Sequence, residues 1–317
     1  MSKIKLTGHA SGSGTLTISA PNTSTDRTIT LPDATGTLAT TLGGLTDVSM
    51  DITNFVDGIL IQTNSDGSAP STGTLSTATG NIGIGKDVFT SLTSGDYNVG
   101  IGNLNFDDIT TGSYNTAIGS AALENHTTGD NNTAIGRSAL EANTTGGNNT
   151  AIGYDALDAN TTAGDNTAVG MNCMTSNTTG AENVAMGRSA MSSNTTASYN
   201  TSIGRNSMLQ NTTGAECVAL GAYALDANTT GSYSTAVGYN ALTANTTGEN
   251  LGIGHSALAA NTTGGDNTAV GRYGAMMANT TGSNNVAVGR GALAANTTAN
   301  NNTAVGWKRG DAISTGH

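Results

Sequence analysis

A repeat of 17 residues fills most of this 317-residue chain and restricts its possible folds more than any other feature. Its core pattern is Asn-Thr-Ala-Ile-Gly, then Ala-Leu, then Asn-Thr-Thr-Gly, and we call the glycine of the first segment the anchor glycine. A fixed period near about 20 residues indicates one small unit stacked many times, which predicts an elongated solenoid and not a globule with an active-site cleft. The anchor glycines are Gly85, Gly102, Gly119, Gly136, Gly153, Gly170, Gly187, Gly204, Gly221, Gly238, Gly254, Gly271, Gly289 and Gly306, with one deletion before Gly254 and one insertion before Gly289.

The residue types at each repeat position, numbered from the anchor glycine, predict a strand and its two faces. Position −1 is large and aliphatic, position −2 is small and position −3 is mostly β-branched, as in Thr133, Ala134 and Ile135. Side chains −1 and −3 therefore share one face of a short strand and −2 points the other way. Ala-Leu at +3 and +4 is expected to form a second extended segment, and Asn-Thr-Thr-Gly a tight corner.

These columns predict an all-β fold, a parallel β-solenoid or β-roll of about 14 coils of 17 residues. At strand geometry such a coil has a perimeter of at most about 55 Å and is thin. We expect the large −1 residues to fill the interior of the coil. A thin coil on its own buries too little apolar surface to be stable. The uniformly small −2 face is then expected to pack against symmetry mates in a homotrimer. The alternative is that alanine at −2 simply fits a narrow single-chain coil.

Composition excludes several classes of function. A net charge of −11 argues against nucleic acid as a partner, and no stretch is long enough for a transmembrane helix, so we expect no membrane insertion. Cys173 and Cys217 occupy different repeat positions almost three coils apart and are not expected to pair. The four histidines lack metal-ligand spacing, so no metal and no cofactor are expected.

The repeat resembles two known families. Thr/Val-Ala-Ile-Gly-x-x-Ala is similar to the head repeats of trimeric autotransporter adhesins, and the full 17-residue version looks more like the repeats of bacteriophage tail fibres. Segments 12–23 and 28–38 are similar to a segment common in phage fibre and virion structural proteins. The resemblance implies a trimeric β-roll in which residues 1–44 are a β attachment segment, 45–80 a transition, 81–306 the shaft and 307–317 a closing tail. An autotransporter fits less well, because signal, coiled-coil and anchor segments are not recognised.

The implied function is structural: a virion tail fibre that docks on another virion protein, contributes to host-cell adhesion and has no catalytic activity. A capsid-attached head fibre or decoration protein is the first alternative, and an extracellular adhesin or ice-binding solenoid the second. A glycan-cleaving enzyme would need two carboxylates facing each other in a groove, whereas the acids here are interpreted as scattered singly. The predicted virion-attachment residues are Leu16, Ile18, Ile29 and Leu31.

Position +1 is the most functional-looking column, because it gathers arginine and aromatic residues on an acidic chain. Such a line could stack on sugars of a host-surface glycan, or it could form ion pairs, between chains or between coils, with the acidic residues that precede the strand. We favour ion pairing. The members of the column are Arg137, Tyr154, Arg188, Arg205, Tyr239, His255, Arg272, Arg290 and Trp307, and the acids are Asp130, Asp165, Glu182, Glu216 and Asp266. Paired threonines in the corners are interpreted as turn and inter-coil hydrogen bonding.

Overall fold

The computed structural model describes residues 77–310 and two short strands before them. The strands β1 to β16 form one sheet and follow each other in chain order; β1 and β2 are antiparallel, and every later neighbouring pair is parallel. The strands are β1 (Val48–Met50), β2 (Ile59–Ile61), β3 (Ile82–Ile84), β4 (Val99–Asn103), β5 (Thr116–Ser120), β6 (Thr133–Ile135), β7 (Thr150–Ile152), β8 (Thr167–Val169), β9 (Val184–Met186), β10 (Thr201–Ile203), β11 (Val218–Leu220), β12 (Thr235–Val237), β13 (Asn250–Ile253), β14 (Asn267–Val270), β15 (Val286–Val288) and β16 (Thr303–Val305).

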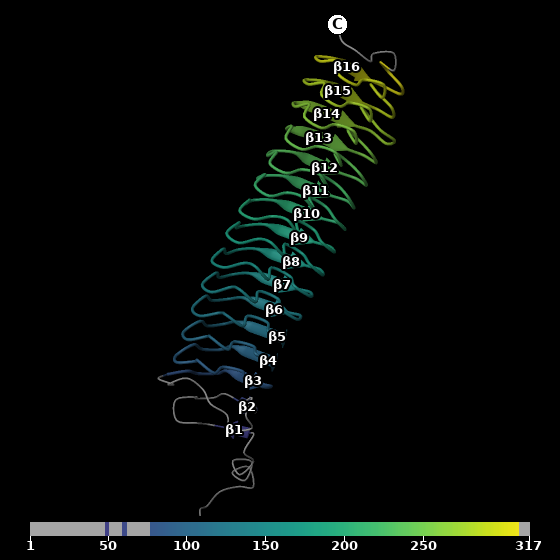
Figure 1. Cartoon of the computed structure of the whole chain (residues 1–317). Helices are drawn as coiled ribbons and strands as arrows, with labels where there is room; N and C mark the ends of the chain where they lie inside the picture. The colour runs from purple at the N-terminus through teal and green to yellow at the C-terminus, as the bar shows by residue number, and fades with distance from the viewer. Residues whose placement is uncertain (1–47, 51–58, 62–76, 311–317) are drawn as a thin grey trace, which may run out of the picture.

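From β3 onward each coil contributes one strand, and the coils stack into a long rod (Figure 1). The rod is a parallel β-solenoid of about 13 turns with a spacing of about 17 residues, which confirms the predicted architecture. Equivalent residues lie side by side, as Thr133, Thr150 and Thr167 do in β6 to β8. The described part of the chain contains strands and turns but no helix, and hence none able to cross a membrane.

The sheet keeps its register through both irregular spacings. Val237 pairs with Ile253 across the deletion and Val270 with Val288 across the insertion. The deletion lies between Gly248 and Asn250, and the insertion places Gly274 before the buried Ala275. Length changes are therefore absorbed in the turns, so the side-chain columns run unbroken along the strands.

The two strand faces point the opposite way from the sequence prediction. The −2 alanines, such as Ala134 and Ala151, are fully buried inside the coil of the single chain. The −1 residues are outside, with Ile135 36% and Ile152 37% exposed. The interpretation of the alanine column as an interface between chains is therefore wrong, and so is the placement of −1 in the core. The interior of a 17-residue coil is narrow, and in most coils the −2 and +3 alanines, one large +4 residue and buried asparagines fill it.

The Ala-Leu segment is not the second strand that we expected. It lies in a run of turns in which +2 and +4 adopt left-handed backbone, as in Ser138 (φ 55°) and Leu140 (φ 54°). Large residues rarely adopt this conformation, so the sequence did not suggest it. Here it turns the +4 side chain inward, where Leu140 is fully buried, and the backbone bonds to the next coil through Leu140 N–H and the Ala156 carbonyl at 3.0 Å.

Two buried asparagine ladders run inside the rod. At +7, the Asn160 amide donates to Asn143 Oδ1 (2.9 Å) and to the Ala163 carbonyl (3.0 Å). At −4, the backbone N–H and the side-chain amide of Asn132 both donate to Asn115 Oδ1 (2.8 and 3.1 Å). Buried amides are tolerated when their hydrogen bonds are satisfied, and in a stack each amide satisfies the next. These residues are part of the interior and not only turn formers.

The +7 ladder begins at His126. In the two coils before it the same position holds the buried apolar residues Leu92 and Ile109. His126 is also buried; its Nε2 lies 2.7 Å from the Gly129 carbonyl, and the Asn143 amide lies 3.1 Å from its Nδ1. Nδ1 also lies 3.3 Å from the backbone carbonyl of Asn143, so polar groups surround both ring nitrogens. Burial lowers the pKa of His126 below its usual 6.5.

The unfolded chain binds a proton at His126 more readily than the folded chain does, so the free energy of unfolding should fall as pH decreases below about 6.5. We expect His126→Asn, which places the usual residue of this column at its first position, to remove this part of the pH dependence. The comparison is thermal unfolding of both proteins between pH 7.5 and 5. An equal loss of stability in the variant over this range would contradict the assignment to His126.

Candidate functional site

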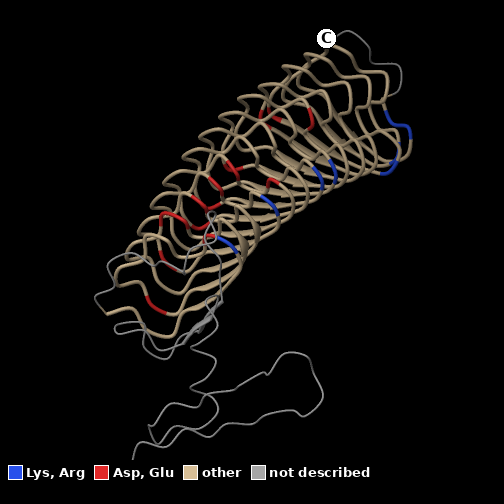
Figure 2. Ribbon diagram, turned by 60° about the horizontal axis from the view of Figure 1, so that its bottom comes forward, with Lys and Arg blue, Asp and Glu red and all other residues tan. Residues whose placement is uncertain are grey.

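The +1 residues lie together along one edge of the rod, just after each strand, and we call this column with its +2 neighbours Tyr223 and Tyr273 the Arg/aromatic edge. Figure 2 shows the lysines and arginines following one edge, with most acidic residues away from it. Tyr154 is 44% and Trp307 67% exposed, and the arginines are exposed as well. The parallel register brings all nine predicted residues into line, although not all of them touch.

Arginines and aromatic rings of successive coils contact each other along this edge. Arg137 donates to the Tyr154 hydroxyl at 2.7 Å and lies over its ring. A second group is longer: Arg205 lies over Tyr223, and the rings of Tyr223, Tyr239, His255 and Tyr273 follow one another at centroid separations of 5.3–6.0 Å. Arg272 and Arg290 both lie over Tyr273. A hydrogen bond from Arg272 lowers the pKa of Tyr273. The +2 tyrosines were not predicted.

No arginine of this edge forms an ion pair with an acidic residue in the described part of the chain. The only ion pair within the described residues joins Lys86 and Asp87 at 3.9 Å. The prediction of ion pairs between coils is therefore wrong, because the acids that precede each strand lie at the other edge of the sheet. Stacking on tyrosine takes the place of those pairs within the chain and leaves guanidinium N–H groups available to a partner.

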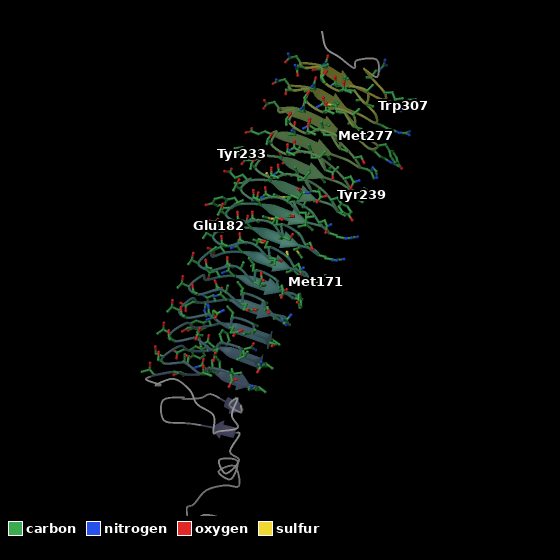
Figure 3. All side chains as sticks on the ribbon, viewed as in Figure 1. Met171, Glu182, Tyr233, Tyr239, Met277 and Trp307 are labelled. Atoms are coloured by element: carbon green, nitrogen blue, oxygen red, sulfur yellow. The ribbon has the colours of Figure 1, made fainter. Side chains whose placement is uncertain are left out.

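Position −5, just before each strand, forms the opposite edge, which we call the Glu/Tyr edge. Tyr199 and Tyr233 are 58% and 59% exposed, and Tyr97 and Tyr114 stack at 5.3 Å. The negative charge of Glu182 raises the pKa of Tyr199. Figure 3 shows Glu182 and Tyr233 projecting from one side of the rod, and Met171, Tyr239 and Trp307 from the other. The members are Tyr97, Tyr114, Asp165, Glu182, Tyr199, Glu216, Tyr233, Glu249 and Asp266.

An open hollow of about 470 Å³ lies on the Glu/Tyr edge, lined by Tyr199, Glu216 and Val218. Tyr199 and Glu216 belong to adjacent coils at −5, and Val218 is a −3 residue of the sheet face. An aromatic face beside a carboxylate is a suitable environment for a cation, above all for a planar guanidinium.

Between the two edges lies an apolar surface formed by −1, which we call the outward aliphatic column. Its exposed members are Ile84, Ile101, Ile118, Ile135, Ile152, Met186, Ile203, Ile253 and Val305. Parallel pairing places each beside its equivalent in the next coil, as Ile118 beside Ile135. Single chains in solution rarely expose a long contiguous apolar surface, so this column is a candidate contact surface.

Acidic residues at +5 also form a column and are not scattered singly as the sequence suggested. Asp107, Glu124, Glu141 and Asp158 occupy this position in four successive coils. Burial, with nearby Asp155 and Glu141, raises the pKa of Asp158 to about 6, and burial with Glu141 raises that of Glu124. No group of three or more His, Cys, Asp or Glu side chains in the described residues could hold a metal ion.

The corner threonines confirm the hydrogen-bonding interpretation at +8. Thr144 Oγ1 donates to the Thr161 carbonyl of the next coil at 3.1 Å, and Thr161 repeats the contact with Thr178 at 3.2 Å. Only the +9 threonines, such as Thr145, are exposed. Cys173 and Cys217 form no disulfide, as predicted, and both are buried.

The predicted attachment residues Leu16, Ile18, Ile29 and Leu31 lie outside the described residues. Comparison of the chain with models of protein families, with curated proteins and with solved structures finds no match. The functional conclusion therefore depends on the surfaces described above and on the repeat itself.

Proposed function

We propose that this chain forms the shaft of a homotrimeric virion fibre, a phage tail fibre, that docks on another virion protein through residues 1–44 and contributes to host-cell adhesion without catalysis. The repeat pattern suggests the family, and the outward aliphatic column carries the proposal. This column runs along the sheet from β3 to β16 and needs a cover of matching length.

A second copy of the same column is the best cover. Its side chains recur at the same inter-strand spacing, about 4.8 Å, so every coil of one rod meets an equivalent coil of the other without mismatch. Charged residues gather at the edges and not on the column, as at many interfaces between subunits. Three copies around an axis parallel to the rods would enclose all three columns.

The mechanism of such a fibre is mechanical and multivalent. Backbone hydrogen bonds link every coil to the next, which makes the rod stiff. Three chains display the same surface positions outside their interfaces at fixed spacing, so individually weak contacts with a cell-surface glycan would add up to avidity. Trp307, at the C-terminal end of the Arg/aromatic edge, is exposed and suited to stacking on a sugar.

The test is the mass of the intact chain in solution by light scattering, together with negative-stain images. We expect three times the 31.4 kDa of one chain, in the form of rods. Deletion of residues 1–44 should then abolish incorporation into virions while the rods persist; recovery of the deletion variant on capsids alone would favour the head-fibre alternative. A mass equal to that of one chain would contradict the proposed trimeric shaft.

The outward face also favours a second candidate, an ice-binding solenoid. It is a regular sheet surface with threonine at −3 in many coils, such as Thr133 and Thr150, beside the aliphatic −1 column. Regular β-branched side chains on a monomer could order water. A monomeric rod that shows thermal hysteresis would support this candidate in place of the fibre.

A further inference from the structure

The two edges of the rod carry complementary residues in several coils. In the coil of β9, Glu182 precedes the strand and Arg188 follows it; in the coil of β14 the corresponding pair is Asp266 and Arg272. All four side chains are exposed. Between them along the rod lie Tyr199 with Arg205, Tyr233 with Tyr239, and Glu249 with His255, whereas in the coil of β11 Glu216 stands opposite Ala222.

The two members of a pair do not meet within one chain. They are six residues apart across an extended strand, a separation of up to roughly 20 Å. They project from opposite sides, as the labelled Tyr233 and Tyr239 show in Figure 3. The opposite charges of the two edges are therefore not paired within one chain, which points to contact between these edges in two copies of the chain.

Symmetry decides which copies bring the pairs together. When chains related by an axis parallel to the rods pack through their sheet faces, the Arg/aromatic edge of one chain meets the Glu/Tyr edge of its neighbour at the same coil. When the axis is perpendicular to the rods, the chains are antiparallel and each edge meets its own equivalent, so arginines face arginines. Opposite charges at matching heights favour the first arrangement and penalise the second.

We propose that neighbouring chains associate parallel and in register, with the Arg/aromatic edge of each chain seated on the Glu/Tyr edge of the next copy. The proposal rests on the assembly proposed above and specifies its orientation and its contacts. Arg188 of one chain meets Glu182 of its neighbour. Arg205 enters the hollow lined by Tyr199, Glu216 and Val218, where the guanidinium lies against the ring and the carboxylate.

Cysteine cross-linking of the intact chain tests these contacts. We expect Glu182→Cys with Arg188→Cys in one chain to give covalent multimers on mild oxidation, and an equal mixture of the two single variants to give covalent dimers. The control is Ser176→Cys with Glu182→Cys, an equally spaced pair whose exposed Ser176 lies on a turn away from the strand. The native cysteines are buried, so the unmodified chain sets the background.

Charge exchange gives an independent measurement. Arg188→Glu alone should weaken assembly about fivefold for each interface by placing like charges together, and Arg188→Glu with Glu182→Arg should restore it. Light scattering on every sample separates the two proposals. Multimers without a cross-link between the cysteines at positions 182 and 188 would contradict the edge contact but not the trimeric shaft. Monomers at all concentrations would contradict both proposals.

Discussion

Two lysines in the outward aliphatic column, Ile135→Lys with Ile152→Lys, are expected to convert the assembled fibre into single chains. Both isoleucines are more than a third exposed in the single chain, so the substitutions remove little from its own core. In a trimer each lysine would have to be buried against equivalent positions of the neighbours, with six like charges near one axis. We expect assembly to weaken by at least about a thousandfold, equivalent to about 4 kcal/mol.

The measurement is the mass by light scattering, with circular dichroism to show that the strands persist. The matched control is Thr145→Lys with Thr162→Lys, which adds the same charge at exposed +9 positions of the same two coils. The control should retain the mass of the unmodified protein. If the isoleucine variant also retains that mass, the outward column is not the surface through which the chains associate.

Periodicity alone predicted the architecture well. The stacking of coils, the parallel register and the alternation of −1 and −3 against −2 all follow from the 17-residue spacing and from side-chain size, whereas the second extended segment expected at Ala-Leu is a run of turns. The prediction that the −1 face points inward was wrong, because the rule that large apolar residues lie inside assumes a core wide enough for them. In this coil the interior accommodates one large side chain, such as Leu140, between alanines.

A signal for the correct choice was present in the sequence. The coil with serine at −2, Ser202, also has serine at +3, Ser207, where most other coils have alanine. The two hydroxyls lie 2.6 Å apart inside the coil. A joint change at two repeat positions indicates contact between them, which places −2 and +3 on the same, inner side.

The asparagine ladders were missed for a similar reason. Asparagine is a common turn residue, so its presence beside Thr-Thr-Gly suggested only a corner. The substitutions within the +7 column indicated burial, since Leu92 and Ile109 occupy it in the first coils. Of the candidate site, the +1 column was predicted, whereas its tyrosine partners at +2 depend on backbone geometry that the sequence did not suggest.

The stacking of coils depends most directly on the anchor glycines, and Gly254→Ala is expected to destabilise the shaft strongly. Gly254 has φ +128°, a conformation that other residues rarely adopt, and an added Cβ would lie 2.1 Å from the Gly271 carbonyl oxygen of the next coil. The carbonyl belongs to the backbone of the next coil and cannot rotate away from the added Cβ, so the two coils must move apart. We expect a loss of at least about 3 kcal/mol from backbone strain and overpacking together.

Gly265→Ala is the matched control in the same coil. Gly265 lacks a positive φ, and the nearest atom to an added Cβ is the Glu249 nitrogen at 4.0 Å. This variant should be neutral or slightly stabilised, because alanine restricts the unfolded chain more than glycine does. Thermal unfolding and hydrogen exchange would compare the two. Because each coil contacts only its neighbours, exchange in Gly254→Ala should increase first at β13 and β14 and leave β6 protected. Equal stability of both variants would show that the coils do not approach as closely as the anchor glycines require.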